Sequence, residues 1–183
     1  SKLNHPVTAK LVISNPPEII VNTTTPKYIG ENSSSGYLNI IESSTFEQLN
    51  DNNVKIESDS ITSAEYIIEI KKITITESSE RETISDANSS YNGATYIVQS
   101  CMVNIEVIVS MEINKEIIYS KEIQTSKDES YSNRRTFWEV IFHQNKDNTE
   151  YHLKELNSSI FDNLCSKESK KISAAITHAI KKS

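Results

Sequence analysis

The 183-residue chain has few of the residues that build familiar nucleotide-binding motifs. It contains three glycines, four prolines, two cysteines and one tryptophan. Gly30, Gly36 and Gly93 lie too far apart for a phosphate-binding loop or a dinucleotide fingerprint, which both need closely spaced glycines. The sequence therefore excludes the usual nucleotide-binding motifs.

Positive charge is scarce as well, since 19 lysines and arginines stand against 25 acids and leave a formal net charge of -6 at pH 7. Proteins that bind a nucleic-acid backbone depend on clustered Lys and Arg side chains that displace counterions. The basic pairs of this sequence, such as Lys71 with Lys72, are separated from one another, and each has acids nearby. We expect solvated faces at these pairs and no nucleic-acid partner.

Long apolar runs are missing too. No stretch approaches the roughly 20 apolar residues that span a bilayer, and the start of the chain, from Ser1 to His5, lacks the apolar core of a signal peptide. An exported protein would still look like this if its signal had been cleaved before Ser1. Hydrophobic residues make up 36% of the chain and come in patterned runs, which indicates a folded protein. Its length fits a single domain over residues 1–183.

The clearest pattern lies between residues 95 and 125. From Ile97 to Ile113 the odd positions are apolar except for Gln99, while the even positions include Ser, Asn and Glu. This alternation predicts a strand with one buried face. Asn114-Lys115 provides a two-residue turn, because Asn tolerates the left-handed conformation that such turns require. The sequence therefore predicts a long antiparallel hairpin over about 95–125.

Two further segments have the three-to-four spacing of amphipathic helices. The first covers about residues 34–49. The second covers about residues 149–182, and we expect it to pack across the sheet. Its apolar stripe consists of Leu153, Leu156, Ile160, Leu164, Ile172, Ile176 and Ile180. The predicted fold class is α+β, or mixed α/β, with one mixed sheet and helices packed on it.

The other segments are extended or irregular. The β-prone segment 64–76 changes its apolar parity near Lys71 and Lys72, which predicts a β-bulge there. Residues 1–9 are expected to form a flexible lead. Residues 77–94 are polar and are expected to form a long mobile loop.

An apolar run at 136–142 is too uniform to assign by its period, and its length and polar flanks favour a short helix. Arg134 and Arg135 precede Phe137 and Trp138 in this region. Basic and aromatic side chains are enriched at interface hot spots, so these four residues form a candidate interaction surface. The alternative is that Trp138 belongs to the ordinary core.

Cys101 and Cys165 have two interpretations. Cys101 lies on the buried parity of its strand and Cys165 is next to the inward Leu164, so a disulfide between sheet and helix is one candidate, which would indicate an oxidising compartment. Two buried thiols without a disulfide are the other. A cysteine nucleophile needs a base within reach. His178 is thirteen residues from Cys165, about 20 Å along one helix, so these two cannot pair.

No other motif predicts chemistry. The Ser and Thr runs contain no nucleophile elbow of the form GxSxG, and no pair of carboxylates is brought together by its spacing. The four histidines show no zinc-binding spacing, and they are His5, His143, His152 and His178. We predict no catalytic residue, no metal site and no cofactor.

The order of the segments resembles a known group of envelope proteins over about residues 36–182. An amphipathic helix precedes the strand Ala64–Glu69, and a polar excursion precedes a hairpin that returns through Lys115–Lys121 to a closing helix. This order is similar to periplasmic lipoprotein domains related to the curli secretion lipoprotein, the penicillin-binding-protein activators and the TolB amino-terminal domain. That group has a glycine soon after the first long strand, where Ile70 and Lys71 stand here, and another in the hairpin turn, where Asn114 stands.

The resemblance implies a non-catalytic bacterial envelope protein that is periplasmic and lipid-anchored through a cysteine upstream of Ser1. It also implies an accessory or assembly role through contact with a protein partner in the envelope, with the membrane contacted only through the lipid anchor. Two other function classes stay open at this point. One is a small hydrolase or transferase with a site assembled from distant polar residues, and the other is a ligand-binding module with an apolar pocket beside the sheet.

Overall fold

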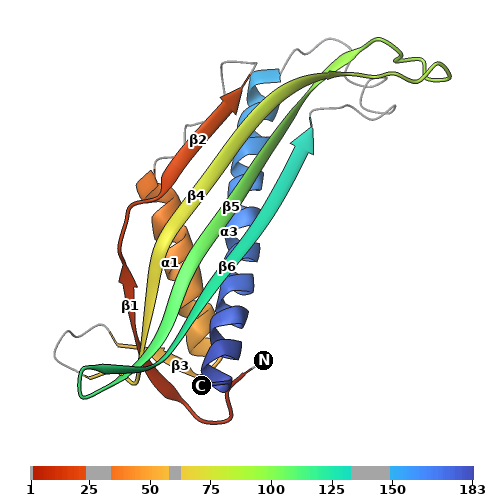
Figure 1. Ribbon diagram of the computed structural model, residues 1–183. Helices are drawn as coiled ribbons and strands as arrows, with labels where there is room; N and C mark the ends of the chain where they lie inside the picture. The colour runs from red at the N-terminus through yellow and green to blue at the C-terminus, as the bar shows by residue number, and fades with distance from the viewer. Residues whose placement is uncertain (1, 24–33, 58–62, 133–148) are drawn as a thin grey trace.

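The computed structural model describes the backbone of residues 2–23, 34–57, 63–132 and 149–183, with their side chains except at 23, 131 and 149–162. Within these ranges a six-stranded mixed sheet is covered on one face by two helices (Figure 1). The helices are α1 (Ser34–Asp51) and α3 (Thr149–Lys181). The strands are β1 (Val7–Ile13), β2 (Glu18–Thr23), β3 (Val54–Ile56), β4 (Tyr66–Thr83), β5 (Thr95–Ile113) and β6 (Glu116–Ser132). The predicted α+β class is confirmed.

The strand order is β3-β1-β4-β5-β6, and β2 also pairs with β4. Strands β1 and β2 follow one another along the same edge of β4, both parallel to it. Pro16 and Pro17 separate them, because proline has no N–H to donate to a ladder. Beside this break the side chain of Asn15 donates a 3.0 Å hydrogen bond to the carbonyl of Lys71. The ladder between β4 and β5 shifts register between Ile70 and Lys72, which confirms the predicted bulge.

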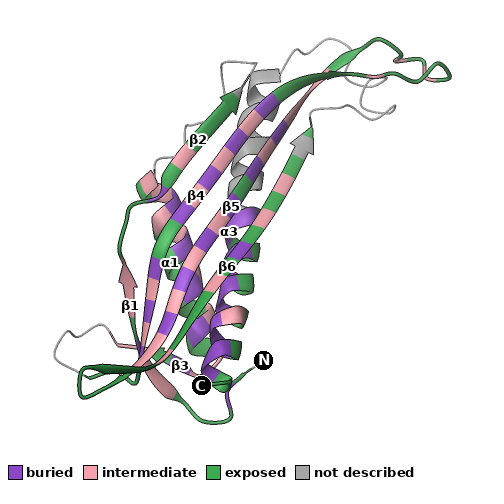
Figure 2. Cartoon of the chain, viewed as in Figure 1, coloured by how far each residue is buried: buried purple, intermediate pink, exposed green. Residues whose placement is uncertain are grey.

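The predicted hairpin is confirmed, and its second strand is longer than expected. Strands β5 and β6 pair antiparallel from Ile113 and Glu116 up to Val98 and Ser132. Asn114 and Lys115 form the turn with φ values of 52° and 66°. Positive φ at both central residues is what a two-residue hairpin turn of the type I′ class requires. The alternating burial of β5 continues through β4, so one face of both strands points to the helices (Figure 2).

The core lies between this inner face of the sheet and the two helices. On the sheet its apolar part consists of Tyr66, Ile68, Ile70, Ile73 and Ile75 from β4 and Val103, Ile105, Val107 and Val109 from β5. Leu164, Ile172, Ile176 and Ile180 of α3 are buried against it, which confirms the described half of the predicted helical stripe. Helix α1 buries Tyr37, Ile41, Thr45 and Leu49.

Helices α1 and α3 run in the same direction across the sheet (Figure 1). Ser173 donates a 3.4 Å hydrogen bond to the carbonyl of Thr45, and further along both helices the side chain of Asn52 donates a 3.2 Å bond to the hydroxyl of Thr177. Small side chains recur every four residues on this side of α3, from Cys165 through Ser169 to Thr177. This spacing places them on one face of the helix, toward α1.

Two expected boundaries were wrong. Residues 77–83 belong to strand β4 and not to a loop, because their backbone groups are paired with β5 whatever the polarity of their side chains, so that the connection is only 84–94. Within the expected flexible lead at 1–9, the described residues 2–9 are ordered, since Leu3 is buried and strand β1 begins at Val7. The amide of Leu3 donates to the carbonyl of Asn52 at 3.0 Å. The expected helix at 136–142 lies outside the described residues.

Candidate functional site

The structure places Cys101 and Cys165 in the buried layer without a disulfide between them. The sulfur of Cys101 lies 3.9 Å from the hydroxyl of Tyr37, on the inner face of β5. Cys165 lies on the face of α3 that meets α1, four residues before Ser169. The structure therefore contains no disulfide between these two cysteines. The alternative of two buried thiols is the one that the structure contains.

Cys101 belongs to a buried polar cluster at the start of α1. Tyr37, which is 1% exposed, donates its hydroxyl to the carboxylate of Glu77, which is 2% exposed. Burial raises the pKa of the Cys101 thiol to about 12, and the nearby Glu77 charge acts in the same direction. The thiol is therefore neutral at physiological pH, which is the wrong state for a nucleophile.

The polar cluster continues along the inner face beyond Glu77. Ser79 pairs with Gln99 across the ladder, and both side chains are buried. Both polar atoms of the Gln99 amide are enclosed without a hydrogen-bond partner among the described residues. We name Glu77, Ser79 and Gln99 the polar part of the inner face, in contrast to the apolar part defined above.

A second buried carboxyl group, Glu168, lies where α3 crosses β6. Thr125 donates its hydroxyl to one carboxyl oxygen of Glu168, while the other oxygen has no partner among the described residues. Burial raises the pKa of Glu168, and the hydrogen bond from Thr125 and the charges of Lys171 and Lys127 partly oppose that change. Because burial disfavours the charged form of Glu168, the stability of the folded protein should depend on whether this carboxyl group is protonated.

Lysines from α3 also cover part of the outer edge of β6. Lys171 donates a 2.6 Å hydrogen bond to the carbonyl of Ser126, and Lys167 forms an ion pair with Glu129. An exposed edge strand presents backbone groups to which another strand can add, and lysines are a common way to prevent this. The edge of β6 around 126–129 is therefore protected against strand addition.

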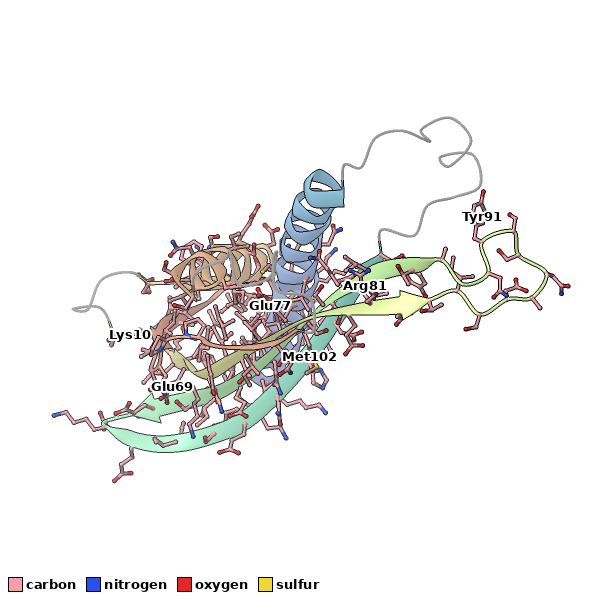
Figure 3. All side chains as sticks on the ribbon, turned by 90° about the horizontal axis from the view of Figure 1, so that it is seen from above. Lys10, Glu69, Glu77, Arg81, Tyr91 and Met102 are labelled. Carbon is pink, nitrogen blue, oxygen red and sulfur yellow. The ribbon has the colours of Figure 1, made fainter. Side chains whose placement is uncertain are left out.

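The opposite, outer face of the sheet carries a patch with little charge. Strand register aligns Ile20 of β2, Thr76 of β4 and Met102 of β5 in one row. Figure 3 shows Met102 on the side of the sheet away from Glu77 and the helices. Neighbouring rows add Thr74 with Asn104 and Ser78 with Ser100. We name these seven residues the outer-sheet patch: Ile20, Thr74, Thr76, Ser78, Ser100, Met102 and Asn104.

The patch combines exposed apolar side chains with hydrogen-bonding groups. Ile20 is 40% exposed and Met102 is 42% exposed. The hydroxyls of Ser78 and Ser100 are hydrogen-bonded to each other across the ladder. At its rim Glu18 forms a 3.4 Å ion pair with Lys72. On the β6 side the rim is Asp128, which pairs with Met102. An apolar centre with a polar and charged rim is the usual composition of a protein interface.

The remaining predictions concern interaction residues and metal ligands. The candidate surface of Arg134, Arg135, Phe137 and Trp138 lies outside the described residues. Within the described residues no three His, Cys, Asp or Glu side chains gather closely enough to hold a metal ion. No helix in those ranges has the length and apolar character to cross a membrane.

Sequence reasoning missed the buried carboxyl groups and the outer-sheet patch. Two signals for the carboxyl groups were present, because Glu168 interrupts the apolar stripe of α3 and Glu77 continues the inward parity of Ile73 and Ile75. The patch had no such signal. Its residues come from three strands, and only the register between the strands brings Ile20 beside Met102.

Comparison with known proteins gives a likeness of layout only. No known family matches the sequence, and no curated protein matches it. Solved structures with a similar course include a homologue of a neuraminyllactose-binding hemagglutinin from Helicobacter pylori, with 15% identity, a TM-score of 0.48 and coverage of 100% of this chain and 96% of that one. A minor lipoprotein from Acinetobacter baumannii has 15% identity, a TM-score of 0.37 and coverage of 88% and 93%.

Rare lipoprotein B from Shewanella oneidensis is similar at 16% identity and a TM-score of 0.30, with coverage of 90% of this chain and 94% of that one. Bacterial lipoproteins are thus among the structures that this chain is similar to. Likenesses at these identities and TM-scores carry no argument about function. The curli, penicillin-binding-protein activator and TolB groups suggested by the sequence are not confirmed.

Proposed function

We propose that the chain is a non-catalytic accessory or assembly protein of a bacterial envelope that binds a protein partner through the outer-sheet patch. The observation that carries this proposal is the row formed by Ile20, Thr76 and Met102, which leaves two apolar side chains in water beside hydroxyl and amide groups. Asp128 of β6, which pairs with Met102, bounds the row on its other side. Binding a partner would remove that apolar surface from water, and the surrounding hydroxyl and amide groups would provide hydrogen bonds.

The burial of the reactive groups supports a non-catalytic role. Glu77, Cys101 and Glu168 are 2%, 4% and 0% exposed. A general acid, base or nucleophile must reach its substrate within hydrogen-bond distance. Each of these groups is instead packed between the sheet and a helix, with a hydroxyl of another element as its neighbour. They are better explained as parts of the packed layer.

The protected edge of β6 supports the face of the sheet as the contact. Lys167 and Lys171 occupy the edge at Glu129 and Ser126, where a partner strand would have to add. A partner is therefore expected to cover side chains on the outer face and not to extend the ladder there.

The test is photo-crosslinking in the native cell, with a photoreactive amino acid in place of Met102 and, as the control, in place of Glu47 on the exposed side of α1. We expect a discrete crosslinked product from position 102 and none from position 47. The product should disappear when Ile20→Glu is added, because a charge would enter the apolar centre. Equal crosslinking at both positions would exclude the patch as the contact.

The compartment is tested separately by fractionation of cells that express the native gene. We expect recovery with the envelope, since the proposal places a lipid-anchoring cysteine upstream of Ser1. Recovery in the cytosol would refute the envelope part of the proposal, whatever the result of crosslinking.

A further inference from the structure

Residues 112–118 form a two-stranded projection beyond the body of the molecule. The third strand, β4, begins at Tyr66, which pairs with Met111, so residues 112 and 113 pair only with β6. Figure 1 shows this turn extending past the sheet, at the end of the molecule opposite the loop 84–94. We name residues 112–118 the isoleucine finger.

The finger carries the three most exposed large hydrophobic side chains of the described residues. Ile113, Ile117 and Ile118 are 54%, 68% and 55% exposed, whereas the other exposed large hydrophobic residues range from 40% to 44%. The cross-strand pairs Glu112 with Ile117 and Ile113 with Glu116 place isoleucine on both faces of the ribbon. Single exposed apolar residues need no explanation, but three at one tip indicate a contact.

The finger is held in a fixed position. Asn114 and Lys115 close it with a tight turn in which both φ values are positive. At its base the hydroxyl of Tyr119 donates a 3.0 Å hydrogen bond to the carbonyl of Ala179 at the end of α3. Because the base is attached to the body, the isoleucines are presented at a defined place.

The amino-terminal segment lies at the same end of the molecule (Figure 1). The carbonyl of Leu3 accepts a 2.7 Å hydrogen bond from the side chain of Asn53, and the amide of Val7 donates a 3.0 Å bond to the carbonyl of Asn53. Asn53 follows α1, and its neighbour Asn52 joins this end of α1 to α3 through the bond to Thr177. An anchor attached upstream of Ser1 would therefore emerge at the same end of the molecule as the finger.

Charge at this end is balanced, although the whole chain carries a net charge of -6. The lysines near this end are Lys2, Lys55, Lys115, Lys181 and Lys182, and the acids near it are Asp51, Glu57, Glu65, Glu112 and Glu116. A surface with little net charge is repelled least by a lipid headgroup region, so this end can approach a bilayer more readily than the acidic remainder.

We propose that the isoleucine finger inserts into the interfacial region of a lipid bilayer and orients the protein on it. This inference rests on the envelope placement proposed above and adds a second membrane contact to the anchor. A second copy of the chain is a poorer occupant, because two seven-residue fingers meeting tip to tip would bury only a few side chains each, whereas stable interfaces bury roughly 1,200 Å² or more, with about 20–30 residues on each side. One weak insertion beside one lipid chain fits the rule that lasting attachment takes two signals.

The test uses the full chain with an amino-terminal histidine tag, bound to phosphatidylcholine vesicles that contain a nickel-chelating lipid and a brominated phosphatidylcholine. Ile117→Trp reports on the finger, and Tyr91→Trp reports on the loop 84–94 at the opposite end. The wild-type chain gives the quenching of Trp138, which both variants also contain. We expect brominated lipid to quench the tryptophan at 117 and not the one at 91. Equal quenching at both positions, or none at 117, would overturn the proposal.

The second measurement is partition of the untagged chain into phosphatidylcholine vesicles by sedimentation. Ile113→Ser, Ile117→Ser and Ile118→Ser together should lower the partition coefficient at least about tenfold, because the inserted area is apolar. Ile20→Ser with Met102→Ser removes exposed apolar side chains elsewhere and should leave it unchanged. A finger variant with wild-type partition refutes the insertion, as does a finger variant that changes the mass of the free protein in solution, which would indicate self-association.

These results are distinguishable from failure of the proposed function. Vesicle insertion is measured on purified protein, so it stands or falls whatever the fractionation of the native gene shows. The finger is also distant from the outer-sheet patch, and its variants should leave crosslinking at position 102 intact.

Discussion

The inner face of the sheet is apolar along one part and polar along the other, although the same two strands form both. Ile73 pairs with Ile105 in the apolar part, whereas six residues further along the ladder Ser79 pairs with Gln99. Full burial of an isoleucine side chain stabilises a protein by roughly 1.5–3 kcal/mol, whereas a buried amide without a hydrogen bond costs about 1–3 kcal/mol. Side chains are buried to a similar degree in both parts. Their burial stabilises the protein in the apolar part and destabilises it at Gln99 in the polar part.

The difference teaches that the stability of the fold is concentrated at the end that bears the termini. There α1, α3 and strands β4 and β5 bring together the buried isoleucines and valines, with Leu49 and Ile176 from the helices. The polar part has Tyr37 above Glu77 as its main side-chain contact from α1. Three substitutions test this contrast, and each compares a residue buried between the sheet and the helices with a matched control.

The largest effect is expected at Ile105, which is fully buried in the apolar part. Ile105→Ala removes methyl and methylene groups and leaves a cavity, so the free energy of unfolding should fall by about 3 kcal/mol. Urea denaturation followed by circular dichroism measures the change. Ile117→Ala on the exposed finger is the control and should lie within about 0.5 kcal/mol of the wild type. A loss below about 1 kcal/mol at Ile105 would mean that the apolar part is not the source of stability.

A gain is expected at Gln99 in the polar part. Gln99→Leu replaces an amide that has no partner among the described residues by an apolar group of similar size, so the protein should become about 1 kcal/mol more stable. The same denaturation experiment applies. Gln124→Leu is the control, because Gln124 is exposed on the outer face, and it should change stability little. Destabilisation by Gln99→Leu would show that the amide is satisfied in solution.

The elements that could be predicted from the sequence are those with a strong local pattern, which needs no tertiary contacts to be recognised. Alternation over β5 and the Asn114 turn gave the hairpin, and the change of parity near Lys71 gave the bulge, both of which the structure confirms. Strand β4 continues through residues 77–83, which the local composition of these residues does not predict. Pairing with β5 satisfies their backbone whatever their side chains, so the polar run was mistaken for a loop.

The candidate site was less predictable. Gln99 and Glu168 were visible as exceptions to apolar patterns, but an exception does not say whether the polar group is buried or whether the pattern ends. The outer-sheet patch depends on the register of β2 against β4, which sequence alone does not fix. The isoleucine finger depends on β4 starting at Tyr66, which leaves the hairpin end unsupported.

The smallest effect, and the one that depends on pH, is expected at Glu168. Burial raises its pKa in the folded protein above the value near 4.3 of an unfolded chain. The folded state then binds more protons than the unfolded state between these two values, so this group makes the protein less stable as pH rises through that window. Glu168→Gln keeps the acceptor for Thr125 and removes the charge, and it should stabilise the protein at pH 7 by up to about 1 kcal/mol.

The check is the difference in unfolding free energy between Glu168→Gln and the wild type, measured from pH 7 down to pH 4.5. The difference should shrink as the pH is lowered, because the wild-type carboxyl group becomes neutral like the amide. Glu122→Gln on the exposed part of β6 is the control and should give a small difference without that trend. If the advantage of Glu168→Gln instead grew toward low pH, Lys127 and Lys171 would dominate over burial, and Glu168 would act as a paired carboxylate.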